Sequence, residues 1–274
     1  MHKCLLIAIF ILGMVNKANS QFFRKDSLHS ANDELDSLPA FTMHKDNYFI
    51  TGTTLKDKPS RNNSDIKYQI SFKQRLRVRP LPGNLIPFLL YTQKAFWDIF
   101  KNSKPFDEIN FNPGFALVRP FYFKGYRQSY LTLSFEHESN GRDSIYSRSW
   151  NYIALSIRTR LNKKWILSMR GWIPFSYQDD NPDLLRYIGY GEFSATYKLK
   201  PNRWSIDMVA RKGSRWDWKG SIQTQLNFRP FKSENEYIML QWFHGFEESL
   251  IDYHDRVSML RLGFVLKANQ LNVF

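Results

Sequence analysis

The feature that most constrains this chain is an alternation of apolar and polar side chains that outlasts an ordinary β-strand. Between Ile66 and Val78, the even positions are almost all apolar and the odd positions are charged or polar. Because successive side chains of a strand point to opposite faces, this segment has one apolar and one polar face. Most strands in soluble proteins have about 5–6 residues, whereas a membrane-spanning strand needs about 9–11. The length therefore favours a strand that crosses a membrane.

The same alternation returns along most of the chain. Together with this first strand, the clear and the weaker candidates bring the number of predicted strands to about a dozen. The clear candidates lie near residues 131–136, 153–160, 164–173, 192–199, 222–228 and 260–267, and the weaker ones near 47–54, 87–97, 114–123 and 203–211. Bacterial outer-membrane barrels have an even number of antiparallel strands. The sequence predicts an all-β fold, a twelve-stranded antiparallel transmembrane β-barrel.

Aromatic residues near the predicted strand ends fit the girdles that barrels place at the two membrane–water interfaces. The candidates are Trp97, Tyr122, Tyr130, Trp150, Trp204 and Trp242. The chain also ends in an aromatic residue, Phe274, as is usual for outer-membrane barrels. A soluble β-sandwich is the alternative, but its strands would be shorter and their polar faces would carry fewer arginines.

The N-terminus predicts a secretory signal peptide. A basic start is followed by an apolar run from Cys4 to Val15, and small residues predict cleavage after Ser20. The run is short for a membrane-spanning helix, which needs about 20 residues. Cys4 is the only cysteine, so the mature chain would fold without disulfides. The predicted organisation is a signal peptide at residues 1–20, an N-terminal lead-in at 21–44 and the outer-membrane barrel at 45–274.

The chain is basic, with 39 Lys and Arg against 25 Asp and Glu. Such an excess could serve nucleic acid, anionic lipid or a solvated polar interior. In a barrel the polar strand faces line the lumen, where basic side chains can pair with Glu136, Glu138 or Glu192. A nucleic-acid site would need a basic patch on a soluble face, so we expect no nucleic-acid partner.

Three polar residues violate the alternation on two neighbouring strands. His137 and Ser139 share the parity of the apolar side chains before them, which places them on the predicted lipid-facing side. Asn151 does the same on the next strand, and the short segment between predicts an antiparallel hairpin. The hairpin brings Asn151 beside the other two. Polar groups that face lipid are costly and often mark function.

These three residue types supply the parts of an acyl-transfer site. Serine offers a nucleophilic hydroxyl, histidine a general base, and the asparagine carbonyl can fix the imidazole tautomer. No G-x-S-x-G motif is present, so an α/β-hydrolase is unsupported. The alternative is an ordinary polar rim, where a strand leaves the membrane and meets its loop.

The segment from His137 to Arg142, His-Glu-Ser-Asn-Gly-Arg, followed by Ser-Arg-Ser-Trp-Asn at 147–151, resembles the signature of bacterial outer-membrane phospholipase A. Weaker similarities extend the resemblance over roughly residues 91–274. The resemblance implies a twelve-stranded barrel that hydrolyses phospholipid and lysophospholipid acyl esters with calcium and is a homodimer when active. It implies Ser139 as nucleophile, His137 as general base and Asn151 as the residue that orients His137.

The resemblance also implies the remaining site residues. The Gly141 amide and a calcium-bound water would form the oxyanion hole. Calcium would be held by the Ser147 hydroxyl, the Arg142 carbonyl and a serine of the partner subunit, for which Ser103 is the candidate. Gln93 resembles the family's dimer-interface glutamine, and its parity with Leu89 and Tyr91 predicts an outward position; the alternative is a lumen residue in a shifted strand.

Two other functions remain open at this stage. A non-enzymatic porin or structural barrel would explain the alternation and the signal peptide but not the polar triad on the apolar face. A secreted soluble lipase would partition into water without detergent. The resemblance favours a calcium-dependent phospholipase of type A1 or A2 that also acts as a lysophospholipase, in the bacterial outer membrane, with phospholipid as its substrate.

Overall fold

The computed structural model describes residues 39–77, 79–121, 129–200, 203–231 and 235–268. The predicted signal peptide lies outside these residues, as do Tyr122 and Phe274. Within the described part of the chain, no helix has both the length and the apolar character of a membrane span.

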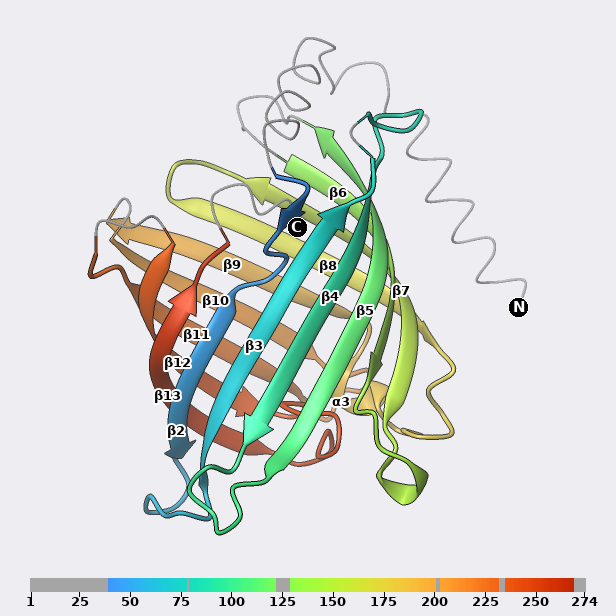
Figure 1. Cartoon of the computed structure of the whole chain (residues 1–274). Coiled ribbons are helices and arrows are strands. Elements are labelled where there is room, and N and C mark those ends of the chain that lie inside the picture. Colours follow the sequence, from blue (N-terminus) through green and yellow to red (C-terminus); the bar gives the residue numbers. More distant parts are fainter. Residues whose placement is uncertain (1–38, 78, 122–128, 201–202, 232–234, 269–274) are drawn as a thin grey trace.

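Twelve antiparallel strands form a closed barrel (Figure 1), which confirms the predicted fold class. Each strand pairs with its neighbours in the sequence, and β13 pairs with β2 to close the barrel. The strands are β2 (Asn47–Thr54), β3 (Ser64–Arg75), β4 (Ile86–Trp97), β5 (Phe106–Phe121), β6 (Ser129–Ser139), β7 (Ser149–Arg160), β8 (Trp165–Phe175), β9 (Gly191–Lys200), β10 (Trp204–Lys212), β11 (Gly220–Phe228), β12 (Glu236–Gly245) and β13 (Val257–Leu266).

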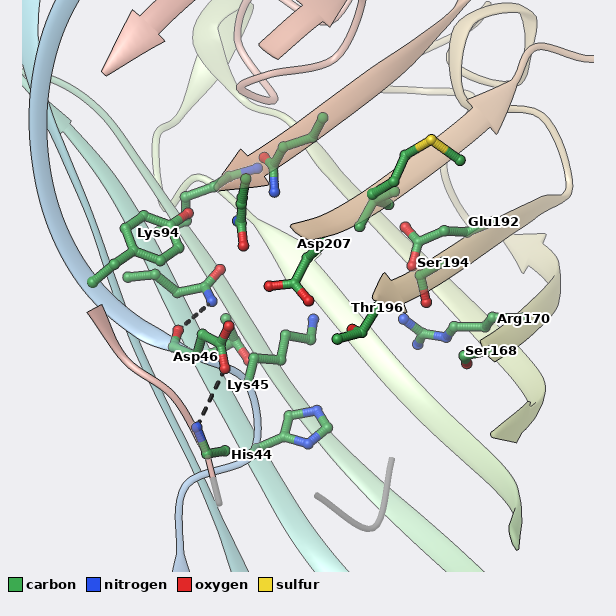
Figure 2. A pocket seen from close by; sticks show the side chains of 18 of the residues that line it. His44, Lys45, Asp46, Lys94, Ser168, Arg170, Glu192, Ser194, Thr196 and Asp207 are labelled. Atoms are coloured by element: carbon green, nitrogen blue, oxygen red, sulfur yellow. Dashed lines mark hydrogen bonds between the residues drawn. The ribbon is translucent and has the colours of Figure 1, made fainter. Parts of the chain in front are cut away.

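A short additional strand, β1 (Phe41–Thr42), pairs with β3 ahead of β2. Phe41 opposes Gln74 on β3, and Tyr48 opposes Gln69. The chain advances seven residues from Phe41 to Tyr48, whereas the facing part of β3 advances only five residues. The extra residues bulge from the sheet, and residues 44–46 between the two strands line the lumen (Figure 2). Strand pairing thus begins at Phe41, inside the predicted lead-in, whose boundary at residue 44 stays a prediction.

The two faces of the barrel wall follow the predicted parity. On β6, Leu133 and Phe135 are 47% and 48% exposed, whereas Thr132, Ser134 and Glu136 are buried. The exposed side chains lie on the outer face because the buried residues of opposite parity line the inner cavity. An apolar outer face is what a bilayer requires of a barrel wall.

The lumen is lined by paired charges as well as by buried apolar clusters. Arg170 of β8 pairs with Glu136, Arg211 of β10 pairs with Glu192 at 2.8 Å, and Lys267 pairs with Asp207 at 2.5 Å. Figure 2 shows Arg170, Glu192 and Asp207 pointing into the cavity. Buried charges are tolerated when they are paired and hydrogen-bonded. The predicted lumen pairing is therefore confirmed for Glu136 and Glu192.

One end of the barrel is packed by loops. The connections after the even-numbered strands meet there, and the β12–β13 connection buries Leu250 completely. Leu250 joins a cluster with Trp150 of β7, with Tyr187 of α3 (Leu185–Ile188) and with Leu184, which precedes that helix. Buried Glu248 fixes the same connection through Lys67 at 2.9 Å and Arg261 at 2.6 Å. Side chains thus fill the mouth beside β7.

A hydrogen bond joins two of these loops. The Tyr253 hydroxyl in the β12–β13 connection donates to Asp183 Oδ1 at 2.6 Å in the β8–β9 connection. Burial and this hydrogen bond raise the pKa of Tyr253 above its ordinary value. The phenol therefore keeps its proton, and can donate this bond, to a higher pH than an ordinary tyrosine.

Two details of the strand prediction were wrong. The segment of β12 was not recognised, because Met239 and Phe243 make its inner face apolar as well as its outer face. The strand predicted near 114–123 begins at Phe106, where polar residues on both faces and Pro113 hide the alternation.

The girdle prediction was also partly wrong. Trp97 and Trp242 lie on outer-face positions, and Trp242 is 37% exposed. Tyr130 and Trp150 are buried on the inner face. Trp204 has outer-face parity and packs its ring on that of Phe228, its cross-strand partner, with centroids 4.5 Å apart. Proximity to a strand end does not decide the face on which a side chain lies; parity does.

Candidate active site

The three candidate residues lie on the outer face of the β6–β7 hairpin. His137 stands directly opposite Asn151, and Ser139 stands opposite Ser149. His137 and Ser139 continue the outward parity of Leu133 and Phe135, and Asn151 continues that of Ile153 and Leu155. All three are half-buried, at the end of the hairpin where the apolar face gives way to the loop.

The imidazole of His137 is held by Asn151. His137 Nδ1 and Asn151 Oδ1 are 2.9 Å apart. Since an amide oxygen only accepts, the hydrogen bond requires the proton on Nδ1 and leaves Nε2 as an acceptor. The arrangement therefore orients the imidazole so that, in its neutral form, its second nitrogen can accept a proton.

Ser139 follows His137 by two residues and lies on the same face, roughly 6–7 Å along the strand. Its hydroxyl makes no hydrogen bond to the imidazole in the described part of the chain. Catalytic hydrogen bonds are often loose before substrate binds, so this does not exclude the pair. On the opposite strand, the Ser149 hydroxyl donates to Asp180 Oδ2 at 2.6 Å. That carboxylate therefore already has a partner.

Gly141 is the second residue of the loop that follows Ser139. Its φ of +67° lies in the left-handed region, which favours glycine. A Cβ added here would meet Cε2 of Phe111 at 3.2 Å. Both the backbone and the neighbouring ring therefore favour glycine, whose amide lies two residues from the serine.

Asn140 organises this loop, and the sequence reasoning gave it no role. Its buried side chain donates to the Tyr146 carbonyl at 2.8 Å, and its Oδ1 accepts from the amides of Arg142 and Arg148 at 3.3 and 3.0 Å. The signal was available, because an asparagine between a strand and a glycine often closes a turn through its own side chain. These three bonds set the path of the chain between Gly141 and Ser147.

The candidate metal ligands lie on two loops. Arg142 directs its guanidinium to Glu108 at 3.4 Å and to the Asp107 carbonyl, and Ser147 ends the short η2 helix (Ser144–Tyr146). Ser103 lies exposed on the β4–β5 connection with a φ of +65°. Within the described chain it makes no hydrogen bond to Arg142 or Ser147. The single chain therefore does not assemble all three.

The chemistry of this donor set suits one class of metal. A main-chain carbonyl and serine hydroxyls are oxygen ligands, which calcium prefers. In the described residues, no group of three or more His, Cys, Asp or Glu side chains could hold a metal. The candidate donors are uncharged oxygens, which fit calcium better than a transition metal.

Gln93 lies on the outer face of β4, as its parity predicts. Its Oε1 accepts from the Tyr91 hydroxyl at 3.0 Å. Gln93 opposes Phe111 on β5, and Phe111 opposes Ser139 on β6, so the three form one row across the outer wall. Gln93 therefore lies two strands, roughly 10 Å, from the serine on the same side of the barrel.

Comparison with known proteins gives one consistent family. The family model described as Phospholipase A1 matches residues 15–266. A Phospholipase A1 of Salmonella typhimurium is 30% identical over 211 residues, which cover 74% of this chain and 69% of the relative. The Phospholipase A1 of Escherichia coli K12 is 29% identical over the same length and coverage.

Solved structures agree in fold. The outer membrane phospholipase A from Escherichia coli superposes with a TM-score of 0.74 at 24% identity, covering 87% of this chain and 98% of that one. A Salmonella typhi outer membrane phospholipase dimer with bound calcium gives 0.75 at 24% identity, with 88% and 98% coverage. At this identity the likeness shows the fold alone.

Proposed function

Because the chain belongs to the phospholipase A1 family, we propose that this outer-membrane barrel hydrolyses phospholipid acyl esters with a Ser139, His137 and Asn151 triad on its outer wall. The observation that carries the proposal is the 2.9 Å contact between His137 and Asn151 on the face that carries Leu133 and Phe135. A site on this face meets acyl chains without drawing them through the lumen.

The chemistry follows from the residues. His137 Nε2 takes the proton of Ser139 Oγ as this oxygen attacks the ester carbonyl. The lysophospholipid alcohol leaves with that proton, and the acyl group remains on Ser139. Water then attacks the acyl-enzyme, His137 takes its proton and returns it to Ser139, and a fatty acid is released. Asn151 keeps Nε2 directed at the serine throughout.

The developing oxyanion needs donors. The Gly141 amide lies two residues after the reacting serine, on a loop that Asn140 holds, so it is the proposed main-chain donor. Calcium, when bound, would add positive charge near this oxygen. The Arg142 carbonyl and the Ser147 hydroxyl would hold it, with Ser103 of a second copy completing the set. The related calcium-bound dimer supports this part of the proposal.

A homodimer would give the outward residues a common purpose. Gln93 is a polar side chain on an apolar wall, and pairing with a second copy would remove it from lipid. Ser103, which the single chain leaves apart from Arg142 and Ser147, would reach them from the partner. Activity that depends on dimerisation would keep a membrane-facing hydrolase silent until two copies meet.

Hydrolysis by the refolded full barrel tests the proposal. In detergent micelles with calcium, a diacyl phospholipid should yield free fatty acid and lysophospholipid, and a lysophospholipid should yield fatty acid. Isotope-labelled acyl chains at the two positions will separate A1 from A2 activity. A barrel that conducts ions across a planar bilayer but releases no fatty acid would favour the porin instead.

Asn140→Ala should lower the rate of hydrolysis by about tenfold or more, because three hydrogen bonds that order the Gly141 loop are lost, each worth about 1 kcal/mol. The matched control is Asn162→Ala. Asn162 caps the β7–β8 turn by accepting from the amides of Lys164 and Trp165 at 2.8 and 2.9 Å, at the far end of the barrel. Equal rates for the two variants would contradict the role given to Asn140.

A further inference from the structure

The inner face of the barrel wall carries a hydrogen-bonded layer directly behind the candidate triad. Glu136 and Glu138 flank His137 on β6, and Tyr152 and Trp150 flank Asn151 on β7. Because parity alternates, these four side chains point into the lumen while the triad points out. Each inner pair is a direct cross-strand partner, as are His137 and Asn151.

Both inner pairs are closed by hydrogen bonds. The Tyr152 hydroxyl donates to Glu136 Oε2 at 2.9 Å, and Trp150 Nε1 donates to Glu138 Oε2 at 3.1 Å. The rings of Trp150 and Tyr152 stack with centroids 4.0 Å apart. The outer His137–Asn151 contact therefore lies between two inner contacts, one on each side along the hairpin.

Asn112 of β5 links this layer to His137 itself. Its amide nitrogen donates to the His137 carbonyl at 2.8 Å and lies 3.2 Å from the Tyr152 hydroxyl. Asn112 is buried and lines the lumen. The pairing of β5 with β6 is interrupted here. Phe111 pairs with Ser139 and Gly114 with Glu136, but Asn112 and Pro113 form no β-sheet pair with Glu138 and His137. The side chain thus supplies a hydrogen bond to the His137 backbone where the regular ladder is interrupted.

The layer ends on a buried charge pair. Glu136 accepts from Ser134 at 2.7 Å and pairs with Arg170 of β8, whose guanidinium lies 5.4 Å from the centre of the Tyr152 ring. Four neighbouring strands, β5 to β8, therefore converge behind one residue of the outer wall. A contiguous and satisfied buried network of this kind holds its members in one arrangement.

From this geometry we infer that Asn112, with Tyr152 and Glu136 behind it, positions His137 for catalysis from inside the barrel. The inference rests on the proposed function of the triad. These are positioning residues, since none of them reaches the outer face where lipid would bind. Their effect is to fix the His137 backbone and thereby the direction of its imidazole toward Ser139.

The test compares two buried lumen asparagines in the full barrel. Asn112→Leu should lower kcat tenfold or more with KM within about twofold, since tenfold corresponds to about 1.4 kcal/mol in the barrier. It should slow the reaction of Ser139 with a sulfonyl fluoride by a similar factor. Asn227→Leu removes a fully buried asparagine on β11 that donates to Asp207 at 2.7 Å, and it should leave both rates within twofold.

Tyr152→Phe keeps the stacked ring and removes only the hydroxyl, so it serves if Asn112→Leu does not fold. We expect a two- to fivefold loss of kcat, because Asn112 still donates to the His137 carbonyl. Wild-type kcat in both Asn112→Leu and Tyr152→Phe, or equal losses in Asn112→Leu and Asn227→Leu, would overturn the inference. If Asn112→Leu does not fold, a wild-type kcat in Tyr152→Phe would by itself overturn the inference. Ser139→Ala in the same assay separates the outcomes, because an active Ser139→Ala barrel would overturn the proposed function itself.

Discussion

Replacing Ser139 with alanine is expected to lower phospholipid hydrolysis by at least about 10³-fold, because loss of a triad nucleophile removes the covalent route altogether. The barrel should fold as before, since the side chain is half-buried on the outer face and makes no hydrogen bond in the described chain. The measurement is the initial rate of fatty-acid release from micellar phospholipid at saturating calcium.

The matched control for this variant lies on the same strand. Ser129→Ala removes a buried hydroxyl 2.7 Å from the hydroxyl of Thr159, at the far end of the β6–β7 hairpin. It should keep the wild-type rate within a few-fold. If Ser139→Ala hydrolysed phospholipid as fast as Ser129→Ala, Ser139 would not be the nucleophile, whatever the roles of His137 and Asn151.

The position of the triad could be predicted because it depends on local parity. Once Leu133 and Phe135 are placed on the lipid side, the two-residue period fixes His137 and Ser139 on that side without knowledge of any other strand. Asn151 needed only the hairpin register, which a short connection constrains. The two-residue period also places Trp150 on the inner face, since its parity is opposite to that of Asn151. The girdle prediction missed this because it was based on the position of each aromatic residue near a strand end.

The parts that could not be predicted depend on residues far apart in the sequence. Asn112 reaches His137 across 25 positions, and Glu248 reaches Lys67 across 181. Nothing in the local pattern distinguishes such a polar lumen residue from its many neighbours. The loop packing at the barrel end beside β7 also depends on residues far apart in the sequence. Leu250 is buried only because β7 and the β8–β9 connection pack against it. Alternation predicts which face a side chain lies on but not its partner on that face.

Removal of calcium is expected to lower the rate of hydrolysis by roughly 10²–10³-fold, the range found when oxyanion stabilisation is lost. Readdition of calcium should restore the rate, whereas magnesium should not, because it demands a tighter octahedral site and keeps its waters. A titration of hydrolysis rate against free calcium in a chelator buffer measures both effects.

Ser147→Ala distinguishes a metal ligand from a general ionic requirement. If the Ser147 hydroxyl binds calcium, its loss should move the titration to higher calcium, by about tenfold for one weakened oxygen ligand at about 1.4 kcal/mol, while the rate at saturation stays closer to wild type. Ser144→Ala changes a hydroxyl at the start of η2, the short helix that ends just before Ser147, and should leave the midpoint unchanged. Identical calcium midpoints for wild type and Ser147→Ala would exclude the Ser147 hydroxyl as a calcium ligand. Full activity in chelator would exclude a role for calcium in hydrolysis, and the Gly141 amide would then be the remaining proposed oxyanion donor.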